Sequence, residues 1–197
     1  MTSRNPVNKE SSIAPRFSLA GHVIVATSMH QGGVFEDAVC IVVEHTADHA
    51  IGLMLNRSAY FDPKLMPALQ LPNGSVHSNL FFGGPIEGPV LAIHDNKNLA
   101  EGGNNLGVYL ACQEKNLMAL TQSETGNLKI FIGHAVWGPK QLDAQVVDGG
   151  WYVLPAIPEI VFSDDRVMRT KALRIVGNQM LQSVTGLSVN EIDGLCN

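Results

Sequence analysis

The stretch AVCIVVEHTADHAIGLMLN, from Ala38 to Asn56, contains two largely apolar runs with four residues between them. The first run, Ala38–His45, is rich in β-branched residues, and such runs are typical of strands covered on both faces. A parallel crossover needs a dozen or more residues, whereas four residues can close a hairpin. The sequence therefore predicts an antiparallel strand pair here, and this pair sets the fold class.

The other elements fit the same fold class. Apolar runs predict further strands at residues 22–27, 80–82, 90–95, 107–111, 128–137 and 150–155. Helices are predicted at residues 63–70, 113–122, 139–148 and 164–184. Pro139 suits the first turn of its helix, Gly149 suits the end, and Ser163 is the expected N-cap of the last helix. Strands and helices do not alternate regularly, so the class is α+β.

Between two of these strands lies LFFGGPIEGPVLAIHD, Leu80–Asp95. Its connection is too short for a parallel crossover and predicts a hairpin-like link. A phosphate-binding loop is the alternative for Gly83 and Gly84. That loop would need successive N–H donors before a helix, but Pro85 and Pro89 have none and a strand follows. The pattern favours a turn in which glycine is needed for its backbone freedom.

The length and composition of the chain favour one globular domain. The chain has 197 residues, is 45% hydrophobic and carries a net charge of −5. We expect residues 1–16 to be a disordered lead-in and residues 17–197 to form a single domain. The acidic balance disfavours direct binding to nucleic acid or to an anionic membrane.

The location is predicted to be cytoplasmic. The N-terminal residues lack the apolar core of a signal peptide, and no stretch is long enough to span a membrane. The three cysteines, Cys40, Cys112 and Cys196, have neither the spacing of a zinc ribbon nor an even count for disulfides.

No motif assigns catalytic residues. His45 and His49 are spaced like two metal ligands on a helix, but the flanking segments are strands, so no metal site is expected. Cys112 precedes a helix, which would lower the pKa of its thiol. It has no assignable histidine partner, and an inert thiol is favoured. Trp137 and Trp151 are interpreted as core anchors rather than as a stacking wall for a ring-shaped ligand.

Several motifs in order resemble the YqgE/AlgH family of small bacterial proteins. They are CIVVEH at 40–45, IGLMLNR at 51–57, FFGGPIEG at 81–88, IFIGHAVWGPKQLD at 130–143, and Trp151 with LPA at 154–156. The match runs from about Leu19 to Val184. Four positions depart from the family pattern. Ser28 stands where proline is usual, His49 and Lys140 stand where glycine is usual, and Gln145 stands where an acid is common.

The resemblance implies an α+β fold with a mixed, largely antiparallel sheet and a small closed barrel, surrounded by helices. It implies no established enzymatic activity. The AlgH name reflects a proposed part in the transcriptional regulation of exopolysaccharide synthesis. No recognition helix of the helix-turn-helix kind is evident, so any regulation is expected to be indirect.

Two hypotheses of function follow. The first is a non-enzymatic binding or regulatory protein, without a cofactor, whose partner is an unidentified small molecule or protein. Its binding residues would come from this set: His45, Asn56, Gly83, Gly84, Trp137 and Gln141. In particular, Gln141 and either His45 or Asn56 should line one cleft. The second hypothesis is a hydrolase or transferase with His45 as general base, assisted by Asp48 or Asp143.

Overall fold

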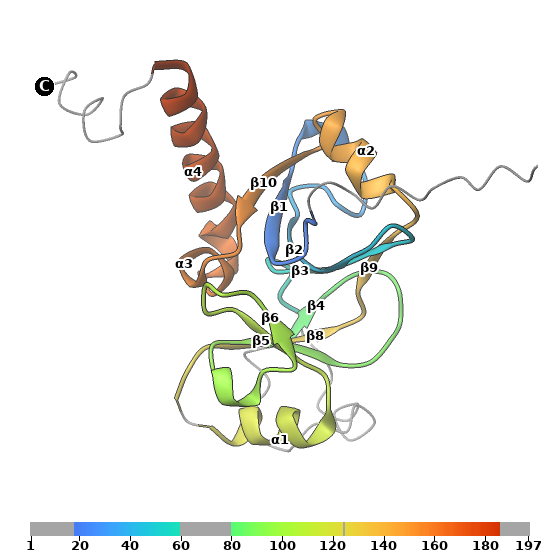
Figure 1. Ribbon diagram of the computed structural model, residues 1–197, viewed down its shortest axis with the longest axis vertical. Coiled ribbons are helices and arrows are strands. Elements are labelled where there is room, and N and C mark those ends of the chain that lie inside the picture. The colour runs from blue at the N-terminus through green and yellow to red at the C-terminus, as the bar shows by residue number, and fades with distance from the viewer. Residues whose placement is uncertain (1–17, 60–79, 124, 186–197) are drawn as a thin grey trace, which may run out of the picture.

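Two five-stranded sheets lie one above the other (Figure 1). The computed structural model describes residues 18–59, 80–123 and 125–185. The upper sheet, sheet A, has the order β10-β1-β2-β3-β9, with strands β1 (His22–Ala26), β2 (Val39–His45), β3 (Ala50–Met54), β9 (Ala135–Trp137) and β10 (Trp151–Pro155). The lower sheet, sheet B, has the order β4-β8-β5-β7-β6, with strands β4 (Leu80–Phe82), β5 (Leu91–His94), β6 (Gly102–Gly103), β7 (Tyr109–Ala111) and β8 (Leu128–Ile132).

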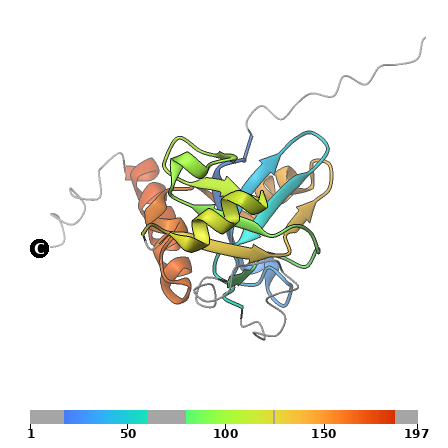
Figure 2. The same ribbon diagram turned by 90° about the horizontal axis from the view of Figure 1, so that it is seen from below.

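Helices cover the outer faces and one side of this pair of sheets. They are α1 (Glu114–Gln122), α2 (Gln141–Val147), α3 (Pro158–Val161) and α4 (Asp165–Thr185), with short 3-10 helices η1 (Ser28–His30) and η4 (Lys97–Leu99). Figure 2 shows α1 lying across sheet B, with α4 along one side. Leu117 and Leu120 of α1 pack on Ala92 and Ala111 of sheet B. Leu142 of α2 packs on the outer face of sheet A.

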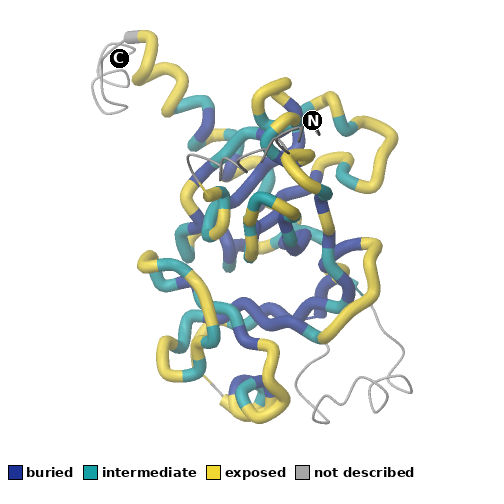
Figure 3. The backbone as a smooth tube through the Cα atoms, turned by 45° about the vertical axis from the view of Figure 1, so that its right-hand side comes forward, coloured by how far each residue is buried: buried dark blue, intermediate teal, exposed yellow. Residues whose placement is uncertain are grey.

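The main core lies between the two sheets and is closed at the side by α3 and α4. Figure 3 shows the buried backbone concentrated in the sheets, while the far end of α4 is exposed. The core cluster includes Val25 and Leu53 from sheet A, Phe131 from sheet B, and Met168 from α4. The strands are therefore covered on both faces, which explains why their sequences are continuous apolar runs.

The predicted hairpin of β2 and β3 is confirmed. The two strands pair antiparallel, with Cys40 opposite Met54 and His45 opposite Ala50. The register shifts between Val42 and Glu44, so Val43 is the extra residue of a β-bulge. Cys40 is buried and its thiol is free.

The predicted pairing of 80–82 with 90–95 is wrong. β8 lies between β4 and β5, parallel to β4 and antiparallel to β5. A short connection fixes that two strands run in opposite directions, but it does not make them neighbours. Here the connection leaves sheet B, and Gly83 O accepts a 2.9 Å hydrogen bond from Met54 N at the end of β3.

The closed barrel implied by the family resemblance is also not found. β10 and β9 are the two edges of sheet A and do not pair with each other. The predicted strand 128–137 is divided at Gly133, whose φ of +71° turns the chain from β8 in sheet B to β9 in sheet A. The strands thus form two open sheets. Sheet A is antiparallel throughout, and β4 with β8 is the parallel pair of the mixed sheet B.

The helix predictions have mixed outcomes. Helices 113–122 and 164–184 are confirmed as α1 and α4, whereas the predicted helix 63–70 lies outside the described residues. The N-cap of α4 is Asp164, whose Oδ1 accepts from Arg166 N at 3.0 Å. Ser163 instead donates from its hydroxyl to Ile160 O, 2.8 Å away, at the end of α3.

One charged side chain lies inside the core. Lys129 of β8 is only 6% exposed. Its Nζ donates to Leu55 O at 3.0 Å and lies 4.2 Å from the centre of the Phe81 ring. Burial lowers the pKa of this amine to about 8, although Asp165 and Asp164 favour the charged form. Lys129 therefore links the two sheets through a donor that loses its charge more easily than an exposed lysine does.

This burial predicts a pH-dependent stability. Between about pH 8 and pH 10.5 the unfolded chain holds more protons at Lys129 than the folded chain does, so the free energy of unfolding rises with pH. From pH 7 to about pH 9.5, the wild type should gain about 2 kcal/mol over a Lys129→Met variant. Urea unfolding of both proteins at both pH values measures this, and a constant or shrinking difference would contradict it.

Candidate functional site

The carboxyl ends of the parallel pair β4 and β8 carry the two glycine-containing connections. Gly83 N donates to Ile132 O at 2.9 Å, just beyond the paired strands. Farther along, Ile86 N donates to His134 O at 3.0 Å and His134 N donates to Ile86 O at 2.9 Å. These N–H groups are committed to the neighbouring segment, so the connection does not present the row of free donors that a phosphate requires.

The glycines allow the two backbones to touch. A Cβ added to Gly83 would lie 2.2 Å from Gly133 O, and one added to Gly84 would lie 2.2 Å from the carbonyl carbon of His134. A Cβ on Gly133 would meet Gly84 O at 2.3 Å. These are backbone contacts that no side-chain movement can relieve. Gly83, Gly84 and Gly133 therefore serve the crossing of two chain segments.

Beside this crossing the surface has a cleft of about 460 Å³. It is lined by Phe82, Gly84, Pro85, Ile86, Glu87, Gly88, Ile132 and Gly133. Phe82 is 38% exposed and Ile86 is 47% exposed, so both offer apolar surface to the cleft. Among the described residues, the lining has one carboxylate, from Glu87, and no histidine, cysteine, serine or lysine.

His45 occupies a different part of the molecule, at the end of β2. Its side chain is only 2% exposed. Nδ1 accepts from Leu19 N at 2.9 Å, and Nε2 lies 3.3 Å from Asp143 Oδ2 on α2. Because the Nδ1 lone pair is occupied by a backbone N–H, the neutral ring carries its proton on Nε2 and donates it to Asp143. The ring has no free lone pair with which to accept a substrate proton.

Asn56 lies at the other end of the hairpin and serves the backbone there. Its Oδ1 accepts from Val39 N at 2.9 Å, and its Nδ2 donates to Asp37 O at 2.9 Å. Asp37 has a φ of +54°, and the Asn56 amide stabilises this left-handed turn at the start of β2. Asn56 therefore does not join His45 in one place.

Trp137 lies in a buried aromatic cluster on the outer face of sheet A. Its ring stacks on Phe35, with centroids 5.4 Å apart, and meets Trp151 edge to face. Gln145 Oε1 accepts from both indole N–H groups, at 3.2 Å from Trp137 and 2.9 Å from Trp151. The two tryptophans are core anchors, as interpreted from the sequence, and Gln145 satisfies both of them.

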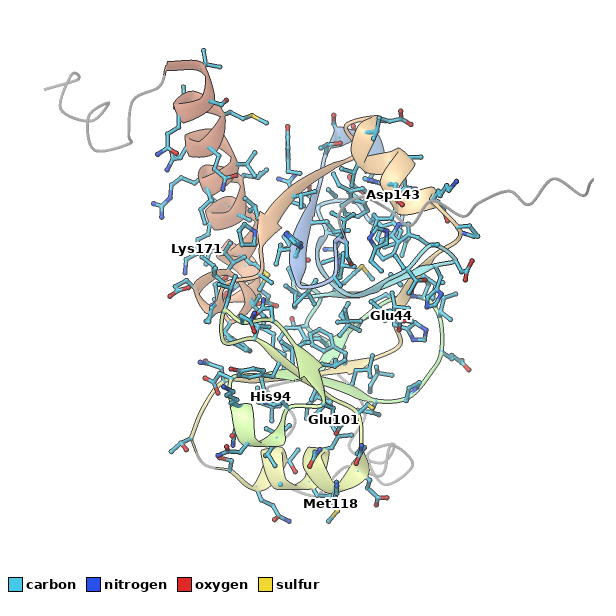
Figure 4. The ribbon with its side chains drawn as sticks, in the orientation of Figure 1. Glu44, His94, Glu101, Met118, Asp143 and Lys171 are labelled. Atoms are coloured by element: carbon cyan, nitrogen blue, oxygen red, sulfur yellow. The ribbon has the colours of Figure 1, made fainter. Side chains whose placement is uncertain are left out.

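Gln141 also makes a local contact. Its Oε1 accepts from Gly138 N at 2.9 Å and closes the turn before α2. The structure thus brings His45 to α2 through Asp143, but it does not show Gln141 and His45 in contact. Of the six residues predicted to bind, Gly84 lines the cleft beside the crossing. Figure 4 shows Asp143 on α2, far from the labelled residues of sheet B.

Comparison with known proteins identifies the family. The model of the AlgH-like family matches residues 23–181. The chain belongs to the AlgH-like family. A UPF0301 protein of Methylococcus capsulatus is 30% identical over 153 residues, covering 74% of this chain and 84% of that protein. One of Rhizobium meliloti is 29% identical over 195 residues, covering 89% and 96%.

Solved structures share the fold. The solution structure of the AlgH protein of Pseudomonas aeruginosa has a TM-score of 0.66 at 21% identity and covers 95% of this chain and 98% of that one. A crystal structure of a Corynebacterium diphtheriae protein has a TM-score of 0.62 at 22% identity, covering 88% and 89%. The family resemblance seen in the motifs is confirmed. It brings no specific activity with it.

Lys140 has an unfavourable backbone conformation in this AlgH-like protein. Lys140 is the N-cap of α2 and has a φ of +56°, in the left-handed region that favours glycine. Its side chain makes no capping hydrogen bond. Glycine would adopt the same backbone without a steric cost, so lysine is strained at this position.

We therefore expect Lys140→Gly to stabilise the protein. Relief of the left-handed strain, reduced by the extra entropy of glycine in the unfolded chain, should give about 0.5–1 kcal/mol. Thermal unfolding measures the gain. Lys140→Ala is the matched control, because it removes the charge but keeps the Cβ, and it should give no gain. Equal effects of the two substitutions would contradict the strain argument.

Glu101 of this AlgH-like protein was not singled out by the sequence. Its carboxylate accepts from Gln113 N at 3.0 Å, from Cys112 N and Sγ at 3.1 Å each, and from Asn116 Nδ2 at 2.6 Å (Figure 4). Desolvation opposes ionisation, but the hydrogen bonds from Cys112, Asn116 and the backbone outweigh it and lower the pKa of Glu101 to about 2. Glu101 thus binds the N-terminal end of α1, although β6 and β7 separate the two in the sequence.

The same contact suppresses the reactivity of Cys112. The hydrogen bond from its thiol to the Glu101 carboxylate raises the pKa of Cys112, and desolvation and the negative charge act in the same direction. The helix N-terminus alone would have lowered it. The distant carboxylate reverses that expectation, and the thiol is a weak nucleophile at neutral pH.

Two further observations bear on the chemistry of the described part of the chain. Within residues 18–59, 80–123 and 125–185, no three histidine, cysteine or acidic side chains come together as metal ligands. His49 Nε2 instead pairs with Glu44 Oε1 at 3.1 Å. None of the described helices is long and apolar enough to span a membrane.

We expect the His45 side chain to stabilise the folded protein. His45→Ala leaves the buried Leu19 N–H without its acceptor and should cost about 1–3 kcal/mol. His45→Asn places an amide oxygen near the position of Nδ1 and should recover part of this loss. Urea unfolding of the three proteins distinguishes them. If the asparagine variant were as unstable as the alanine variant, the Leu19 contact would not be the reason for burying His45.

Proposed function

We propose that this AlgH-like protein is a non-enzymatic binding protein and that its binding site is the cleft beside the β4–β8 crossing. The observation that carries the proposal is the lining of this cleft. Phe82, Ile86 and Ile132 give it apolar walls, and Glu87 contributes its one charge. A volume of about 460 Å³ suits a small molecule, since such pockets commonly measure roughly 300–1,000 Å³.

The chemistry of the lining specifies the ligand class. An apolar body would pack against Phe82 and Ile86, and a cationic group would meet the Glu87 carboxylate. We therefore propose a small amine with an aromatic or branched apolar part. The rigid floor of the cleft supports this, because Ile86 and His134 hold each other by two hydrogen bonds.

A regulatory role would be indirect and cytoplasmic. The net charge is −5, and the arginines at the start of α4 are paired, Arg166 with Asp164 at 2.8 Å and Arg169 with Asp37 at 3.1 Å. These pairings weaken α4 as a surface for phosphates. Free thiols at Cys40 and Cys112 fit a reducing compartment. Any effect on transcription would then pass through a partner that senses the occupied cleft.

The alternative, a hydrolase or transferase with His45 as general base, has less support. Asp143 does lie beside His45, as such a mechanism would need, but Leu19 N–H occupies the other ring nitrogen. His45 is almost completely buried. A general base must reach the proton that it removes, and this ring offers no free acceptor.

The cleft is tested by titrating three matched probes into the isotope-labelled protein and following NMR shifts. We expect phenethylamine to bind most tightly, phenethyl alcohol about fivefold more weakly, and phenylpropionate most weakly, because an exposed ion pair contributes up to about 1 kcal/mol. Glu87→Gln should abolish the preference for the amine. Ile86→Asp should abolish binding of the uncharged alcohol.

The matched control is Val147→Asp, which places the same new charge at an 84% exposed position on α2. It should leave all three affinities unchanged. The proposal fails if none of the probes shifts the resonances of the cleft. It also fails if the preference for the amine survives Glu87→Gln, or if Ile86→Asp and Val147→Asp have the same effect.

A further inference from the structure

A second, smaller cavity lies between the two sheets, away from the cleft. It has a volume of about 90 Å³ and shares no lining residue with the cleft. Aliphatic side chains from both sheets line it, namely Ile41 and Val43 from sheet A and Ile93, Val108 and Leu110 from the sheet B side. No acidic or basic side chain of the described part of the chain lines it. A charged ligand would therefore lose its hydration without gaining a partner.

Irregular backbone surrounds this cavity on three sides. The β-bulge of β2 places the extra residue Val43 at its wall. Gly21 has a φ of +76° and Gly103 a φ of +136°, and both line the cavity. A Cβ on Gly103 would lie 2.4 Å from Val108 O. The path of the backbone therefore forms the walls of the cavity. Bulges of this kind are over-represented beside functional sites.

The Asn104 side chain holds the rim of the small cavity, and all of its hydrogen-bonding groups are occupied. Asn104 Nδ2 donates to Ala156 O at 2.8 Å and to Gly21 O at 3.4 Å. Its Oδ1 accepts from Leu106 N at 2.9 Å and from Val108 N at 3.2 Å. Asn104 thus connects the β6–β7 turn of sheet B to one end of the β1–β10 pair, where Gly21 precedes β1 and Ala156 follows β10. The entrance is fixed in place, and its amide is not available to a ligand.

We propose that this cavity binds the apolar part of a small uncharged molecule, on the order of four non-hydrogen atoms in size. The size follows from comparison with a cavity of about 150 Å³ that holds benzene. The uncharged class follows from the lining, which offers aliphatic side chains and no ion. This second site does not depend on the proposed function of the cleft, because the two have no residue in common.

The test uses cyclopentanol as the uncharged probe and cyclopentylamine, which is cationic at neutral pH, as its charged counterpart. Methyl resonances of Ile41, Val43, Ile93, Val108 and Leu110 are followed by NMR. We expect saturable shifts with cyclopentanol and none with cyclopentylamine. Val43→Leu adds one carbon to the wall and should weaken cyclopentanol binding about tenfold, the effect of one methylene in a filled apolar pocket.

Val146→Leu is the matched control, since Val146 is a half-buried valine that packs in the other core cluster, on α2. It should not change cyclopentanol binding. Val108→Ile is a second filling variant, and should one variant fail to fold, the other decides. The proposal is overturned if cyclopentanol gives no saturable shifts in the wild type. Equal binding to the wild type and a folded filling variant, or equal binding of the amine, would overturn it too.

Discussion

Two chain segments, one leaving β4 and one running from β8 in sheet B to β9 in sheet A, cross each other, and their backbones touch at distances that only glycine allows. Gly83 and Gly84 leave β4, Gly133 leaves β8, and an added Cβ at any of the three would collide with the opposite backbone. Gly83 O also accepts from Met54 N at the end of β3. The relative placement of the two sheets therefore depends on this crossing, and the large cleft lies directly beside it.

Two polar side chains also connect the sheets, and each has hydrogen-bond partners. The Lys129 ammonium reaches Leu55 O across the core, and the Asn104 amide reaches Gly21 O and Ala156 O at the opposite side. Each connects a strand or turn of sheet B to the end of a strand in sheet A. Buried polar groups of this kind select one arrangement of two apolar faces that could otherwise slide over each other. The small cavity is left where the strands beside the Asn104 contact are irregular.

Structural hydrogen bonds also limit the reactions that several polar side chains could take part in. His45, Gln145, Glu101 and Asn56 are each committed to a structural contact. Cys112 donates its thiol proton to a carboxylate. Catalytic groups need a free lone pair or a reactive proton facing a cavity. The two cavities described here are lined mainly by apolar side chains.

The sequence determined what depends on near neighbours. Four residues between apolar runs made β2 and β3 a hairpin, and Gly149 ended α2, with Gly150 N donating to Gln145 O at 2.7 Å. The motifs also fixed the family. Only the tertiary structure decided that β8 enters between β4 and β5, that Lys129 is buried, and that Gln145 joins two tryptophans. These outcomes depend on which distant segments together bury the most apolar surface and pair most of the buried backbone groups, and no short stretch of sequence contains that information.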